Sequence, residues 1–300
     1  MTVIEHIWPW PWWGVMVAIN ICNLAICIAC FRNSLLRPDG NSTYVRNMRI
    51  MGLVFTLVAL YRAVFVSRYL YQYAWFDTLA NSSLVIRTFA WGAELSFAGL
   101  IAFSMLRFNR DMARHDDSYA LSRYEKLAPY GLILCIFVAQ FFATGGLITK
   151  SRLLFAIEES LWSAGFFTIL PLAIIQFRRA SKQALPSTYI MLRRSSLVLL
   201  SWCVIYCSYG LVYHLPTEYW ATALEQLRTG EPQLKTGFSA IKDAFKSVNV
   251  THHYPDWGFG FVLWHSAYFS VCVWLSIFLM RAPRYLGAEQ QGALLEGRAH

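Results

Sequence analysis

The sequence has little charge and no cysteine outside its apolar segments. Only 14% of the 300 residues are charged, whereas a soluble domain carries about 25%. Because 57% of the residues are hydrophobic and they gather in long runs, an ordinary soluble domain is excluded. All seven cysteines fall inside those runs, which excludes a framework of disulfides between loops.

The sequence has instead seven apolar runs, each close to the roughly 20 residues that cross a bilayer as a helix. They cover residues 9–31, 48–70, 83–106, 128–148, 153–177, 195–214 and 258–280. This pattern predicts an all-α, multi-pass integral membrane protein with seven transmembrane helices. We expect one transmembrane domain over residues 1–286 and a disordered tail over 287–300. The pattern does not identify which membrane.

The basic residues predict the orientation of the chain. They crowd the first, third and fifth connections and the C-terminal tail, and they are absent from the N-terminus and the second connection. Positive charge marks the cytoplasmic side, so we expect the N-terminus outside and the C-terminus inside. The net charge of +9 is therefore a signature of contact with the lipid bilayer, and no nucleic acid partner is expected.

The sixth connection, residues 215–257, is the one long loop, and this orientation places it outside. It contains two stretches in which apolar residues recur at helical spacing. The sequence therefore predicts two short helices lying on the membrane surface as a lid. The first has Trp220, Leu224 and Leu227 on one face, and the second has Phe238, Ile241, Phe245 and Val248.

Ionisable residues inside the spans are the main functional signal, because charge in lipid is costly and marks function. The predicted orientation places all of them in the outer half of the bundle and leaves the inner half almost without ionisable groups. They are Arg62, Arg68, Arg87, Glu94, Glu158, Glu159, His214 and His265.

Helical spacing predicts how some of these side chains face one another. Arg87 and Glu94 are two turns apart on one face, with Trp91 between them. Of the adjacent Glu158 and Glu159, we expect Glu158 to face the bundle interior. The candidate catalytic residues are Glu94, Glu158 and His265, and the candidate substrate-binding residues are Arg62, Arg87, Trp91, Trp264 and Tyr268.

Three chemistries are compatible with these residues. His214, His253 and His265, with a carboxylate, could ligate zinc or iron, although no HxxxH or HExxH spacing is present. Buried carboxylates could act as metal-free acids and bases. The arginines could instead bind an anionic headgroup, phosphate or carboxylate without any chemistry.

Seven spans with the N-terminus outside resemble receptors and opsins in topology alone. The last predicted span contains no lysine over residues 259–280, so retinal bound covalently as in the microbial rhodopsins is not expected. The third span ends Leu106-Arg107-Phe108-Asn109-Arg110 and therefore lacks the acidic-Arg-aromatic triplet of the G-protein-coupled receptors. The sequence assigns no family.

Three functions remain open at this level. The first is a membrane-embedded enzyme acting on a lipid-like or amphiphilic substrate. The second is a receptor, sensor or transporter-like protein that binds a small anionic or amphiphilic ligand, although an inner half without ionisable groups argues against transport. The third is a structural subunit of a membrane complex. The sequence predicts no oligomeric state.

Overall fold

The computed structural model describes residues 8–37, 40–115, 120–182, 190–246 and 249–283. Within these residues, seven helices are long and apolar enough to span a membrane, in agreement with the seven predicted runs. The predicted tail lies outside the described residues. These seven helices are α2 (Pro9–Leu35), α3 (Thr43–Val64), α4 (Ser83–His115), α5 (Arg123–Thr149), α6 (Arg152–Lys182), α7 (Ile190–Tyr209) with its extensions, and the run Tyr254–Met280.

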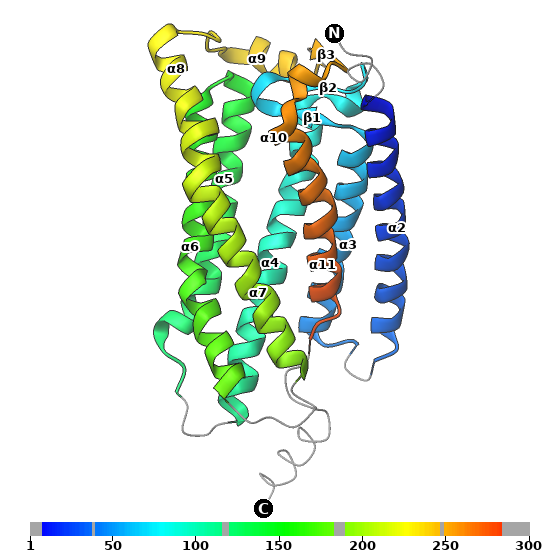
Figure 1. Ribbon diagram of the computed structural model, residues 1–300, viewed down its shortest axis with the longest axis vertical. Helices are drawn as coiled ribbons and strands as arrows, with labels where there is room; N and C mark the ends of the chain where they lie inside the picture. The colour runs from blue at the N-terminus through cyan, green and yellow to red at the C-terminus, as the bar shows by residue number, and fades with distance from the viewer. Residues whose placement is uncertain (1–7, 38–39, 116–119, 183–189, 247–248, 284–300) are drawn as a thin grey trace, which may run out of the picture.

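The helices form one bundle in which consecutive helices from α2 to α7 pack against each other (Figure 1). The last run, composed of α10 (Tyr254–Ala267), a π-helical turn (Tyr268–Cys272) and α11 (Val273–Met280), returns to pack against α3, α2 and α4. The apolar window of α4 is 67% buried and that of α2 only 22%. The helix α4 is therefore the central one, and α2 lies at the edge.

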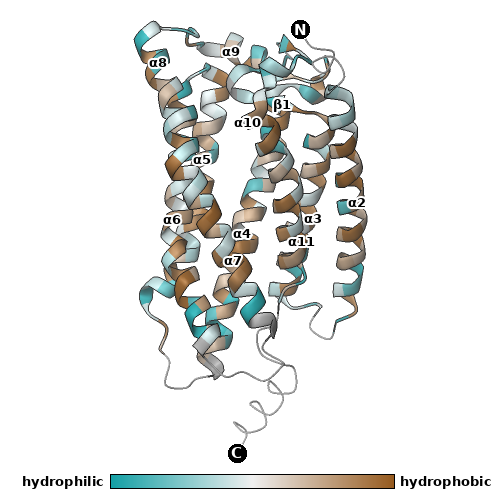
Figure 2. Cartoon of the chain, in the orientation of Figure 1, coloured by the Kyte–Doolittle hydropathy of each residue, from teal (hydrophilic) through white to brown (hydrophobic). Residues whose placement is uncertain are grey.

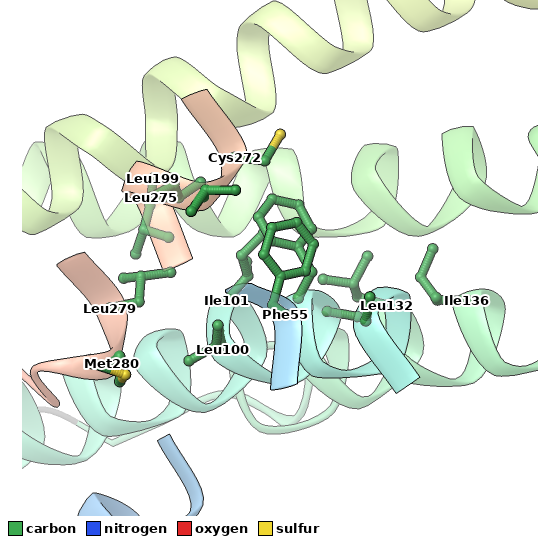
Figure 3. Packing of buried hydrophobic residues seen from close by; sticks show 14 of the residues in the cluster. Phe55, Leu100, Ile101, Leu132, Ile136, Leu199, Cys272, Leu275, Leu279 and Met280 are labelled. Atoms are coloured by element: carbon green, nitrogen blue, oxygen red, sulfur yellow. The ribbon is translucent and has the colours of Figure 1, made fainter. Parts of the chain in front are cut away.

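Hydrophobic residues run along the sides of the bundle, and hydrophilic residues gather at its ends (Figure 2). Inside, Phe55 stacks on Phe97 with ring centroids 5.1 Å apart, and Leu132 and Leu275 belong to the same cluster (Figure 3). Because lipid tails are as apolar as these side chains, van der Waals packing rather than hydrophobic burial holds such helices together.

Local sequence signals account for several helix ends. The side chain of Ser42 accepts a hydrogen bond from the Val45 amide at the start of α3. At the start of α5, Ser122 and Glu125 form a capping box, in which each side chain accepts a bond from the other's backbone N–H. Gly230, with φ of 74°, ends α8 (Ala221–Thr229) in the left-handed conformation that glycine tolerates.

The second predicted span is too long, because α3 ends at Val64 rather than at residue 70. The chain then forms β1 (Ser67–Arg68) and β2 (Tyr73–Ala74), which pair antiparallel, and β3 (Asn249–Val250) adds to β2 in parallel. Arg68 therefore lies in a strand and not in a span. The β-branched and aromatic residues after Val64 suit this pairing, and the strands satisfy backbone groups that a helix would otherwise bond internally.

The lid prediction is wrong for its first helix. The helix α7 continues through a π-helical segment (Gly210–Trp220) into α8, so Trp220 and Leu224 belong to an extension of the sixth span. Hydrogen bonding continues past Pro216 and no separate surface helix begins there. The second helix exists as α9 (Gly237–Ala244), with Ala244 buried against the bundle and Phe238 exposed. Val248 lies outside the described residues.

The extension of α7 into α8, the helix α9 and the three strands lie together at one end of the bundle, near the start of α2 (Figure 1). We call this the sheet end. The C-terminal side of α11 lies at the opposite end.

Candidate functional site

A buried ionic network links three helices in the sheet-end half of the molecule. The guanidinium of Arg87 donates to both oxygens of Glu94, over 3.2 and 2.9 Å, and lies 3.4 Å from Glu158. It also donates to the side-chain oxygen of Gln140, whose amide nitrogen donates to Glu94 over 2.9 Å. The predicted Arg87–Glu94 pair is therefore present, and α5 and α6 each add one residue to it.

The network is almost closed to solvent. Arg87 is 2% exposed, Glu94 is 6% and Glu158 is 8%. Glu158 faces the interior as predicted, whereas Glu159 accepts a hydrogen bond from the Tyr206 hydroxyl over 3.0 Å. Buried charges are retained only when they are paired and hydrogen-bonded, which Arg87 achieves with two carboxylates and an amide.

Arg62 is a second buried guanidinium, but it is not part of that network. It is 5% exposed and lies between two aromatic rings, 5.0 Å from the centroid of Tyr69 and 5.0 Å from that of Phe269. Across the described residues it makes no hydrogen bond and no ion pair. Arg87 therefore holds two carboxylates and Arg62 holds none.

His265 is fully buried among aromatic rings. Its ring centroid lies 4.5 Å from Phe269 and 5.4 Å from Trp12. Neither ring nitrogen has a hydrogen-bond partner among the described residues. Two further candidates, Trp264 and Tyr268, stack on each other with centroids 5.2 Å apart beside it.

Other candidates lie apart from this group. Trp91 packs against α5, where its indole N–H donates to Thr144 over 2.9 Å. His214 contacts Tyr209 and Glu218, and His253 is exposed at the start of α10. In the described part of the chain, no three His, Cys, Asp or Glu side chains gather as metal ligands. The zinc or iron site on His214, His253 and His265 is therefore not supported.

A pocket of about 620 Å³ opens at the sheet end. Its walls come from the β1–β2 hairpin, the turn between α5 and α6, and α8. The wall residues that matter below are Tyr69, Lys150, Arg152, Thr222, Glu225 and Glu231. The ring of Tyr69 belongs to this wall and also lies on Arg62 and, 6.0 Å from its centroid, on Arg87. A single aromatic ring thus separates the pocket from both buried arginines.

The pocket wall carries both signs of charge, with Lys150 and Arg152 beside Glu225 and Glu231, and Arg152 lies 4.0 Å from Glu225. Partial burial and the neighbouring Lys235 ammonium lower the pKa of Lys150 below the usual lysine value. Burial raises the pKa of the Tyr69 phenol above its usual value, so the phenol keeps its proton at neutral pH. Two neighbouring cations that repel each other are stabilised when an anion binds near them.

Two ion pairs lie toward the end opposite the sheet end, on helix positions beyond the predicted spans. Arg107 pairs with Asp111 over 2.8 Å, and Glu125 pairs with Arg179 over 2.5 Å. These residues were assigned to loops, but α4, α5 and α6 extend far enough to carry them as helix residues.

Sequence reasoning missed two residues of the site. Gln140 is a lone amide in an apolar span, and that isolation could have identified it as the partner of a buried charge. Tyr69 carried no such signal, because residues 69–73 alternate tyrosine with other residues in a segment that was assigned partly to a helix. Its position between the pocket and the arginines depends on the β1–β2 turn.

No protein-family model matches the chain, and no similar protein is found among the curated proteins or the solved structures. The fold itself defines a bundle of seven apolar helices that is compatible with a multi-pass membrane protein.

Proposed function

We propose that this protein spans the membrane with its sheet end outside and binds a small anionic molecule from that side. The observation that carries the proposal is the pocket of about 620 Å³ whose wall ring, Tyr69, lies directly on Arg62 and Arg87. Ligand sites are concave and combine apolar walls with a few placed polar groups, as this pocket does. Of the two basic wall residues, Arg152 lies beside Glu225, and Lys150 is the one that suits an anionic group.

Binding has better support than catalysis. Glu94 and Glu158 both contact Arg87, and His265 is enclosed by aromatic rings. None of the three lines the pocket. An acid–base mechanism needs its groups within hydrogen-bond reach of a substrate, and these candidates do not share one open space. We therefore favour a receptor, sensor or transporter-like protein over a membrane-embedded enzyme.

The proposal is tested by blocking the pocket. Small soluble anions, with inorganic phosphate and formate first, are titrated into the purified protein in uncharged detergent while thermal unfolding is followed. Thr222→Trp fills the pocket and should abolish any anion-dependent rise in the unfolding temperature. Thr217→Trp adds the same ring at an exposed position of the same helical run and should leave the rise intact. Equal responses of the two variants would reject the pocket as the binding site.

A further inference from the structure

Three polar side chains that form no hydrogen bond within the described part of the chain lie behind the pocket wall. The Arg62 side chain is only 5% exposed, and its guanidinium forms no hydrogen bond or ion pair among the described residues. The Tyr69 hydroxyl is buried without a partner, and so are both ring nitrogens of His265. Leaving fully buried groups such as the Tyr69 hydroxyl and the His265 nitrogens unbonded in a low-dielectric interior is costly, so a native structure needs a reason for each.

Arg62 contacts the Tyr69 ring directly, and Phe269 lies between Arg62 and His265. The ring of Tyr69 lies 5.0 Å from the central carbon of Arg62, and Phe269 lies at the same distance on another side of that guanidinium. Phe269 also contacts His265, with ring centroids 4.5 Å apart. A guanidinium packed between ring faces keeps its N–H groups free at its edge, in the fork that matches a carboxylate or phosphate.

The missing partner is an acceptor rather than another donor. Arginine can only donate, and a protonated phenol and a neutral imidazole each have a hydrogen to give. Glu94 and Glu158 contact Arg87, and neither forms a hydrogen bond or an ion pair with Arg62 among the described residues. Around Arg62, the chain therefore presents donors and positive charge that an oxyanion would satisfy.

We propose that the pocket continues behind Tyr69 into an oxyanion subsite, in which Arg62, the Tyr69 hydroxyl and His265 bind the carboxylate or phosphate group of the ligand. The Tyr69 ring separates this subsite from the pocket and moves aside when the ligand enters. It can do so because it sits on the short 3-10 turn (Tyr69–Tyr71) between β1 and β2 rather than inside a long helix. This inference rests on the proposed function of the pocket and adds the chemical class of the ligand.

The decisive variant is Arg62→Met, which keeps most of the side-chain volume and removes the charge. In a Tris–chloride buffer without oxyanions, it should unfold at the same temperature as the parent or higher, because an unpaired buried charge is lost. It should bind inorganic phosphate or formate about 10- to 100-fold more weakly, as expected when hydrogen bonds to a charged group are removed.

Two further variants separate this effect from general damage. Tyr69→Phe keeps the ring and removes the hydroxyl, and it should weaken phosphate binding about tenfold while leaving the fold unchanged. The matched control is Arg68→Met, because Arg68 also stacks on aromatic rings but donates to the backbone oxygens of Asp256 and Trp257 over 2.9 Å. This control should lose stability and retain its phosphate affinity.

The source of the oxyanion is tested with two probes and a neutral control. Inorganic phosphate represents a free anion, dihexanoyl phosphatidate represents a lipid headgroup, and dihexanoylglycerol carries no charge. The two anions, and not the neutral lipid, should raise the unfolding temperature of the parent, and the probe that binds more tightly identifies the source. Both responses should fall in Arg62→Met.

Three results would overturn the subsite. The parent could fail to respond to phosphate, formate and phosphatidate alike. Arg62→Met could bind them as the parent does. It could also unfold far below the parent without oxyanions, or not fold, which would make Arg62 a structural group. Loss of binding in Thr222→Trp with normal binding in Arg62→Met would reject the subsite and leave the pocket's proposed function standing.

Discussion

At the scale of single residues, Arg87 is the centre of the buried charge in the sheet-end half. It bonds Glu94 and Gln140 and lies 3.4 Å from Glu158, so each of these groups depends on it. Glu94 is less critical, because without it Arg87 would keep Glu158 and Gln140. Loss of Arg87 should therefore destabilise the protein more than loss of Glu94.

We expect Arg87→Met to lower the free energy of unfolding by about 3–5 kcal/mol, because it leaves two buried carboxylates without a counter-ion. Glu94→Gln should cost less, and the double variant should cost less than the sum of the two. Unfolding in detergent measures all three. Arg110→Met, at an exposed position of the same helix, controls for loss of charge. Strictly additive losses would show that Arg87 and Glu94 do not interact.

Lys150 should make stability depend on pH. Because its pKa in the folded protein is lowered from 10.5, its contribution to the free energy of unfolding is most favourable above pH 10.5. The contribution is lost as the pH falls through the lowered pKa. Lys150→Met should therefore be more stable than the parent at neutral pH, and its advantage should shrink as the pH rises toward 10.5.

Thermal unfolding of the parent and Lys150→Met across this pH range measures that difference. Lys242→Met, at an exposed position of α9, controls for the removal of one positive charge. An advantage that stays constant with pH would contradict the assignment to Lys150.

At the scale of elements, a close helix contact lies between α3 and α11 at Gly52. A methyl group on Gly52 would come within 2.5 Å of the Cβ atom of Met280. The absence of a side chain at Gly52 therefore allows the last helix to close the bundle, since small residues let membrane helices approach each other.

We expect Gly52→Ala to lower the free energy of unfolding by about 1–3 kcal/mol, because overpacking forces the helices apart. Gly14→Ala is the matched control, since nothing lies within 4 Å of the added methyl group in α2. Alanine favours a helix over glycine by about 1 kcal/mol, so this control should be neutral or stabilising. Unfolding of the two variants in the same detergent makes the comparison, and equal effects would contradict the close contact.

At the scale of the whole molecule, every functional proposal depends on which end faces outward. Basic residues crowd the end opposite the sheet end, and the pocket opens at the sheet end. The positive-inside tendency therefore predicts that the pocket meets the exterior.

Cysteine labelling in intact cells tests this orientation. Gln233→Cys, between α8 and α9, should react with a membrane-impermeant maleimide, whereas Asn41→Cys at the opposite end should react only after the cells are permeabilised. The reverse pattern would place the pocket inside and remove the proposed route of ligand entry. The parent, whose seven cysteines lie in helices, measures background labelling.

The sequence by itself determined the number of long apolar helices, the Arg87–Glu94 pair and the inward direction of Glu158. These features depend on the length of apolar runs and on the 3.6-residue helical period, which are local properties. Helix ends were less predictable: α3 stops at Val64 because the strands at the sheet end offer its backbone other partners.

Only the tertiary structure decided which polar groups meet. Gln140 joins Arg87, Trp91 turns toward α5, and Arg62 remains beside Tyr69 and Phe269 without a carboxylate. These contacts depend on how helices far apart in the sequence are placed against one another. That placement is set by close packing at positions such as Gly52, and no local pattern encodes it.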